Sequence, residues 1–173
     1  DQGEIAKSPD SRISLLPQDV PDDLPGTVYE IVASGGQEHL DLLRQYHELT
    51  GQLFQDGTPE QLKKLERVQH SMEASGAWHF HQRVEKLISQ TGLTENAEFR
   101  LLSAGLKRRV FLARALANDP DLLLLDVLMP ELDGVETCRR LKENPAWRDI
   151  PVIFLTSKSE TGDIVRGFEV GAV

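Results

Sequence analysis

Asp126 is the residue with the clearest chemistry, because it closes the apolar run Leu122–Leu125 and precedes a polar loop. A continuous apolar run is typical of a strand that is buried on both faces of a parallel sheet. Proteins of the α/β class bind ligands at the carboxyl ends of such strands. A carboxylate in that place can hold a metal ion or act as a nucleophile. The sequence therefore predicts a ligand-binding site here, with two chemistries open.

A second candidate lies upstream, where Ser103, Ala104 and Gly105 precede a helical pattern that runs to about Ala117. Ser103 stands at the expected N-cap of that helix. Small residues let backbone N–H groups approach a phosphate, and the N-terminus of a helix favours negative charge. The segment therefore predicts an anion-facing helix start, and a serine that only caps the helix would explain the same residues.

The elements that must position these residues follow the order strand, helical block, helix, strand, helix, strand, helix. We expect three parallel strands at Arg12–Leu16, Leu122–Leu125 and Val152–Leu155. Three apolar stripes at spacings of three and four predict helices between 27 and 90: Leu40, Leu43, Tyr46 and Leu49; Leu62, Leu65, Val68 and Met72; Phe80, Val84, Leu87 and Ile88. The fold class is therefore α/β, a small parallel sheet flanked by helices with an inserted helical subdomain.

The composition excludes several functional classes. The 173 residues are 39% hydrophobic and 27% charged, as in a soluble globular protein, and the net charge of −9 disfavours a broad nucleic-acid surface. Cys138 is the single cysteine, so a reducing, cytoplasmic location is expected, with no membrane span. The first residue is not Met, which predicts a piece of a longer protein. Histidines 70, 79 and 81 are interpreted as surface residues rather than metal ligands.

Residues 1–126 resemble an ATP-binding cassette domain. The text "LLSAGLKRRVFLARALANDPDLLLLD" is similar to the signature motif and Walker B strand of that family, over residues 102–126, and "LLPQDVP" is similar to its Q-loop. The helical subdomain, about 27–90, is similar to the cassette's helical insertion. Its sequence is most similar to that of the soluble ABC-F group. The resemblance implies nucleotide binding by five residues: Gln18, Ser103, Ala104, Gly105 and Asp126.

The cassette resemblance implies Mg²⁺ and ATP as cofactors and the ribosome as partner. Gln18 and Asp126 would hold the metal. However, no G-x-x-x-x-G-K-[ST] motif occurs among the 173 residues, and Val127 stands where the family has its catalytic Glu. We therefore expect weak or absent nucleotide binding and no complete catalytic set.

Residues 127–173, together with Asp126, resemble the second half of a response-regulator receiver domain. The text "DVLMPELDGVETCRRLKENPAWRDIPVIFLTS" carries the resemblance. It implies that Asp126 accepts a phosphoryl group, that Thr156 contacts that group, and that a histidine kinase is the partner. The acidic pair and the lysine of that family have no counterpart in the sequence.

Both matched segments include Asp126 at the end of a strand. We therefore predict a chimera of the two families that is joined at this strand end. Three hypotheses follow: a cassette-type ATPase fragment, a phosphoaccepting receiver, and a scaffold that descends from these families but has no activity. We also expect unpaired sheet edges that favour self-association.

Overall fold

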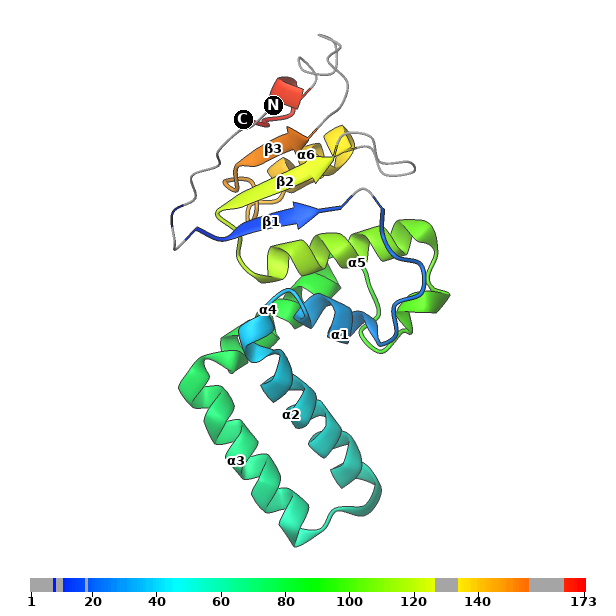
Figure 1. The fold of residues 1–173 in the computed structure, drawn as a ribbon, viewed down its shortest axis with the longest axis vertical. Helices are drawn as coiled ribbons and strands as arrows, with labels where there is room; N and C mark the ends of the chain where they lie inside the picture. The colour runs from blue at the N-terminus through cyan, green and yellow to red at the C-terminus, as the bar shows by residue number, and fades with distance from the viewer. Residues whose placement is uncertain (1–7, 9–10, 18, 127–133, 156–166) are drawn as a thin grey trace, which may run out of the picture. The chain divides into compact units, whose positions relative to one another are not determined.

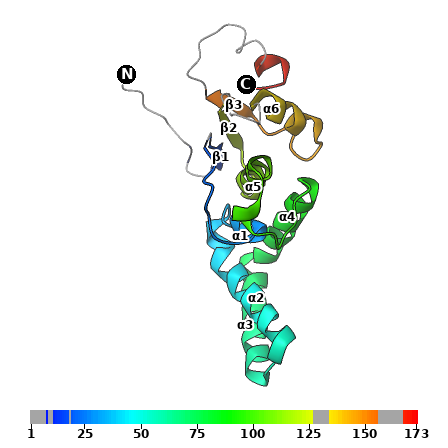
Figure 2. The same ribbon diagram turned by 90° about the vertical axis from the view of Figure 1, so that its right-hand side faces the viewer.

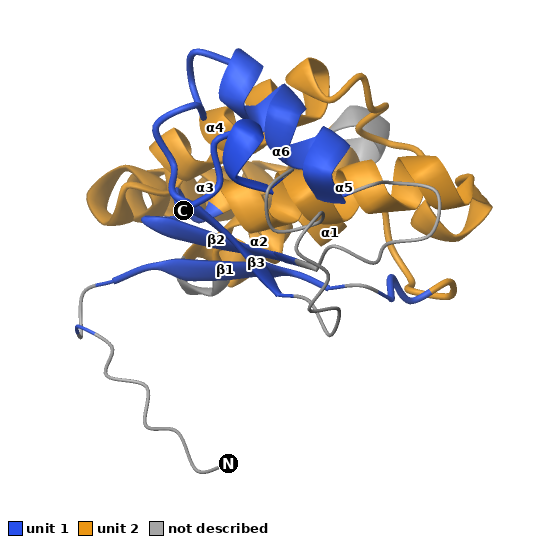
Figure 3. Cartoon of the chain, turned by 90° about the horizontal axis from the view of Figure 1, so that it is seen from above, with its two compact units in different colours: residues 1–21, 118–173 blue, residues 22–117 orange. Residues whose placement is uncertain are grey.

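The computed structural model describes residues 8, 11–17, 19–126, 134–155 and 167–173 (Figure 1). Its elements, in chain order, are β1 (Ile13–Leu16), α1 (Val28–Ala33), α2 (Gln37–Asp56), α3 (Pro59–Ser75), α4 (Ala77–Gln90), the 3₁₀ helix η1 (Phe99–Leu101), α5 (Ala104–Ala117), β2 (Leu122–Asp126), α6 (Gly134–Glu143) and β3 (Val152–Leu155). The chain divides into two compact units, which are coloured separately in Figure 3. Unit 1 is residues 1–21 with 118–173, and unit 2 is residues 22–117.

Unit 1 is built on a parallel sheet with the strand order β1-β2-β3. Leu16 pairs with Leu125, and Asp126 pairs with Leu155, so the three strands end along one edge (Figure 1). The three strands predicted from sequence and the α/β class are thereby confirmed. The continuous apolar runs form these strands because parallel strands bury side chains on both faces.

The two faces of this sheet differ. Leu123 and Leu125 are fully buried, and α6 lies over one face (Figure 3), where it buries Cys138 and Leu141. On the opposite face, Leu15 is 54% exposed and Leu155 is 43% exposed. Side chains alternate between the faces along a strand, so one face of the sheet is apolar and open to water.

In unit 2, a long antiparallel hairpin of α2 and α3 projects from a base formed by α1, α4 and α5 (Figures 1 and 2). Helix α3 begins with a capping box between Thr58 and Gln61 and ends at Gly76, which adopts a left-handed conformation with φ of 76°. Such caps satisfy backbone groups that a helix end leaves unpaired. The three stripes predicted between 27 and 90 lie on α2, α3 and α4, as expected.

The core of the base is apolar and tightly packed. Val28, Val32, Phe99 and Val110 are fully buried there. Helix α1 begins with its own capping box, in which the Thr27 hydroxyl accepts from the Glu30 N–H. The first turn of α1 also donates to carbonyls of the segment after α4, from Val28 N–H at 2.9 Å. These bonds hold the loop that precedes α5.

In the residues that the structure describes, no helix is both long enough and apolar enough to span a bilayer.

Candidate functional site

The start of α5 presents small residues to open space. Ser103 Oγ accepts from the Leu106 N–H at 3.4 Å, and the Ser103 carbonyl accepts from the Lys107 N–H at 2.9 Å. The predicted cap is therefore confirmed. Ser103 and Ala104 are exposed, and a Cβ on Gly105 would meet no atom within 4 Å. A phosphate could approach these backbone N–H groups without displacing a side chain.

Lys107 is a polar residue of this segment that sequence reasoning missed. Its side chain is only 9% exposed, and its Nζ donates to the Asp22 carbonyl at 2.8 Å and to Asp22 Oδ1 at 3.0 Å. The ammonium also lies 5.7 Å from the centre of the Phe99 ring, within the range of a cation–π contact. Lys107 thus ties the chain after β1 to the start of α5.

A signal for Lys107 was present in the sequence. Val110 and Phe111, three and four residues later, are apolar, so Lys107 stands on the buried face of an amphipathic helix. A charged residue on that face is buried only when its charge is paired.

Asp126 is the last residue of β2, and its backbone pairs with Leu155, the last residue of β3. The register confirms that Asp126 sits at the carboxyl edge of a parallel sheet, where ligands of α/β proteins bind. Gln18 and Thr156, the other predicted contacts at this edge, lie outside the described residues. The predicted roles of these three side chains therefore stay predictions.

The candidate residues fall in both units. Ser103, Ala104 and Gly105 belong to unit 2, and Asp126 belongs to unit 1. The structure thus describes two separate candidate segments, one at a helix start in unit 2 and one at a strand end in unit 1. Across the described residues, no group of three or more His, Cys, Asp or Glu side chains is arranged to hold a metal ion.

The prediction that histidines 70, 79 and 81 lie on the surface was wrong for His81. His70 and His79 are exposed, as predicted, but His81 is 9% exposed. Its Nδ1 lies 2.7 Å from the hydroxyl oxygen of buried Tyr29. His81 precedes Val84 by three residues on the apolar stripe of α4, and that spacing could have identified it as a core residue.

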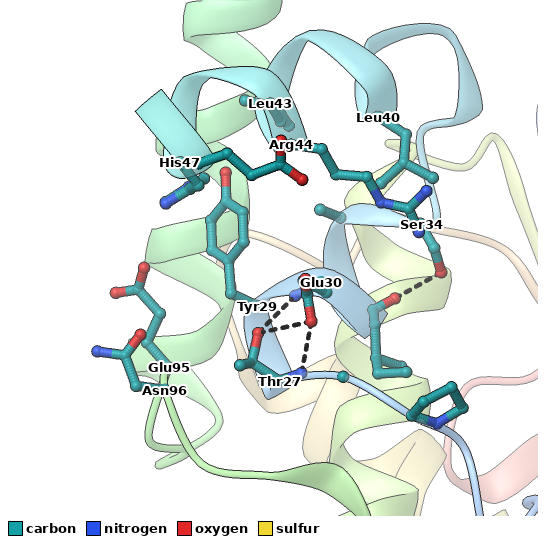
Figure 4. Close-up of a pocket in the computed structure, with 15 residues that line it drawn as sticks. Thr27, Tyr29, Glu30, Ser34, Leu40, Leu43, Arg44, His47, Glu95 and Asn96 are labelled. Carbon is teal, nitrogen blue, oxygen red and sulfur yellow. Dashed lines mark hydrogen bonds between the residues drawn. The ribbon is translucent and has the colours of Figure 1, made fainter. Parts of the chain in front are cut away.

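A cavity of about 640 Å³ opens between α1, α2 and the segment after α4 (Figure 4). Figure 4 shows Glu30 and Tyr29 along its floor, Arg44 and His47 above them, and Glu95 at the side. The Glu30 carboxylate accepts from the Thr27 N–H at 2.7 Å as part of the helix cap. Burial raises the pKa of Tyr29, with a smaller contribution from the nearby carboxylates. This cavity belongs to the helical subdomain and contains none of the predicted site residues.

Comparison with known proteins supports both resemblances. A family model for the response regulator receiver domain matches residues 81–173, and this match begins upstream of Asp126. Response regulator PleD of Caulobacter vibrioides is 42% identical over 76 residues, which cover 44% of this chain and 17% of that protein.

The cassette relatives cover more of the chain. The ATP-binding protein Uup of Haemophilus influenzae is 37% identical over 133 residues, which are 77% of this chain and 21% of that protein. Uup of Escherichia coli is 34% identical over 137 residues, again covering 21% of that protein. The chain therefore spans about a fifth of the length of these curated relatives.

Solved structures share the fold. A putative metal-chelate type ABC transporter in an inward-facing conformation has a TM-score of 0.56 at 20% identity, over 95% of this chain and 55% of that one. The match to cbiO1 of Clostridium perfringens has a TM-score of 0.50 at 22% identity, over 85% of this chain and 47% of that one. With the matched range 81–173 covering more than half of its residues, the chain belongs to the response regulator receiver domain family, and it carries ABC ATP-binding ancestry as well.

Proposed function

We propose that this chain is a cassette-type fragment, of the ABC-F kind, that contacts Mg-nucleotide weakly and does not hydrolyse ATP by itself. The observation that carries the proposal is the start of α5, where a capped helix leaves Ala104 exposed and no atom lies within 4 Å of a Cβ added to Gly105. That arrangement offers the N–H groups of a helix start and a favourable dipole to a phosphate.

Turnover needs more than this contact. A Gly-rich loop with its lysine holds the β- and γ-phosphates in cassette-type ATPases, and the 173 residues contain no such motif. Val127 follows Asp126 in the sequence, and its side chain cannot act as a general base. Mg²⁺ held by Asp126 and Gln18 would therefore lack both a positioned phosphate and a base.

An NMR titration with Mg-ATP tests binding apart from turnover. We expect the backbone N–H signals of Ser103, Ala104 and Gly105 to shift at millimolar nucleotide, while those at the tip of the α2–α3 hairpin stay in place. A Gly105→Glu variant places a negative charge beside the helix start and should weaken the shifts. The proposal fails if these signals do not move, or if Gly105→Glu leaves them unchanged.

The receiver is a second candidate function, favoured by the family match and by the sheet register. Asp126 ends β2 beside Leu155, the last residue of β3, and this pairing supports Asp126 as the phosphoacceptor of the proposed receiver site. We expect phosphorylation of Asp126 to be weak, because the sequence offers no counterpart of the acidic pair or of the lysine. The test is incubation with acetyl phosphate and Mg²⁺ followed by intact mass. An abundant phosphoadduct that is lost in Asp126→Asn would show a working receiver site.

The partners follow from the same two ancestries. The proposed partner of the cassette part is the ribosome, and the proposed partner of the receiver part is a histidine kinase. The proposed location of the chain is the cytoplasm. Self-association through the edges of β1 and β3 is a third proposal, since each of these strands pairs on one side within the described residues.

A further inference from the structure

Five ring side chains in unit 2 form a cluster where α2 meets α1 and α4. We name it the ring cluster; its members are Tyr29 on α1, Tyr46 and His47 on α2, and Trp78 and His81 on α4. The centres of the Tyr29 and His47 rings lie 4.3 Å apart, and those of the His47 and His81 rings lie 5.6 Å apart. The Tyr46 and Trp78 rings meet edge to face at 5.0 Å. The cluster therefore joins the α2–α3 hairpin to its base through rings, two of which are imidazoles.

His81 lies between a buried hydroxyl and a carboxylate. Its Nδ1 lies 2.7 Å from the Tyr29 hydroxyl oxygen, and its Nε2 lies 3.4 Å from Glu85 Oε1. When the ring proton is on Nε2, Nδ1 accepts from the Tyr29 hydroxyl, and this hydrogen bond joins α4 to α1.

His47 is the more constrained of the two histidines. Its Nε2 is buried and makes no hydrogen bond within the described residues. His47 also lines the cavity of about 640 Å³, which gives its ring a path to water. A neutral His47 ring can leave its buried Nε2 without a hydrogen bond at little cost. A charged His47 ring would carry a proton on Nε2 and would bury that N–H without a partner.

Several charged or titratable groups surround His47: Tyr29 and Glu30 on α1, Arg44, Tyr46 and Glu48 on α2, His81 and Glu85 on α4, and Glu95 after α4. Burial lowers the pKa of His47 from 6.5, and the neighbouring His81 lowers it further. Glu95, Glu85 and Glu30 act in the opposite sense, but the net direction of the pKa is downward.

We propose that the ring cluster is a proton-operated latch, which holds α2 against α1 and α4 while His47 is neutral and releases α2 when His47 becomes charged. A charged His47 ring would bury an N–H without a hydrogen-bond partner, and the carboxylates around the ring offset only part of that cost. This inference does not depend on nucleotide or phosphoryl chemistry.

The direction of the pH effect follows from the pKa of His47. Because the pKa is lower in the closed state than in the released state, the released state binds protons more readily. The stabilisation by the neutral ring is therefore fully present above 6.5, the ordinary value, and is lost as the pH falls through the pKa of the closed state.

Hydrogen exchange of the α2 amides tests the latch in the whole chain. Between about pH 7.5 and about pH 5.5, after correction for intrinsic exchange rates, we expect protection of α2 to fall up to about ten-fold relative to α5. His47→Gln, which cannot be charged, should remove most of this pH-dependent loss. The matched control is His79→Gln, an exposed histidine of α4, which should lose protection as the parent does.

A second measurement covers the case that His47→Gln does not fold. In the unaltered chain, NMR titration of the imidazole signals of His47 should show that the α2 signals change at the same pH as the His47 ring. The latch is wrong if α2 keeps its protection at low pH, if His47→Gln loses as much as the parent, or if the α2 signals change at a different pH from His47.

Discussion

Lys107 shows at the residue scale how the loop after β1 is held. Its buried ammonium donates two hydrogen bonds to Asp22, whose own side chain is 88% exposed. Ser103 was recognised from sequence because helix caps follow a local rule. Lys107 and His81 were not, although each stands on the apolar face of its helix, because polar residue types are mostly exposed.

We expect Lys107→Met to lower the free energy of unfolding of unit 2 by about 1–2 kcal/mol, because both hydrogen bonds are lost while the apolar stem keeps its packing. The matched control is Arg109→Met, on the exposed side of α5, which should change stability by less than about 0.5 kcal/mol. Urea unfolding followed by Trp78 fluorescence, in a Trp147→Phe background, measures both variants. Equal effects of the two substitutions would show that the Asp22 contact contributes nothing.

At the scale of elements, the packing of α1 against α5 depends on a close approach of their backbones. Gly35 follows α1, and a Cβ built on it would overlap the Arg114 carbonyl oxygen of α5. The contacting atom is backbone, so the two helices would have to move apart. Gly51, in the middle of α2, has no atom within 4 Å of such a Cβ.

Gly35→Ala should therefore destabilise unit 2 by about 1–3 kcal/mol, as expected for overpacking. Gly51→Ala, which adds the same methyl group in open space, should stabilise it by about 0.5–1 kcal/mol through helix propensity. Thermal unfolding followed by circular dichroism compares the two variants. A stabilising Gly35→Ala would mean that α1 and α5 are not packed as described.

The elements were predictable to different degrees. The strands of the sheet were found because runs such as Leu122–Leu125 are short, wholly apolar and bounded by polar turns. The separation of α1 from α2 at Gly35 and Gly36 was not predicted, because it depends on contacts with α5 and with the Phe80 ring. At the candidate site, the helix start and Asp126 were placed correctly, whereas the sequence cannot show which side chains Asp126 meets.

The whole molecule consists of two units with unequal cores. Unit 2 has a large apolar core of local helices, whereas unit 1 leaves one face of its sheet open, with Leu15 54% exposed. Each unit contains one tryptophan, Trp147 in unit 1 and Trp78 in unit 2. Helices with local contacts need little from other parts of a chain, whereas a parallel sheet depends on both of its layers.

We therefore expect two unfolding transitions in urea. In single-tryptophan variants, Trp147 (in Trp78→Phe) should report unfolding of unit 1 at a lower urea concentration than Trp78 (in Trp147→Phe) reports for unit 2. Coincident midpoints would indicate one cooperative molecule and would contradict the independence of the helical block.

Phosphate release from Mg-ATP tests most directly the central proposal, that Asp126 corresponds to a phosphate-handling residue of both families while the cassette site is incomplete in this chain. We expect release no faster than in a control without protein, and Val127→Glu should not raise it, because a base is of no use without a held nucleotide. Steady release above that control, abolished by Asp126→Ala, would contradict the account.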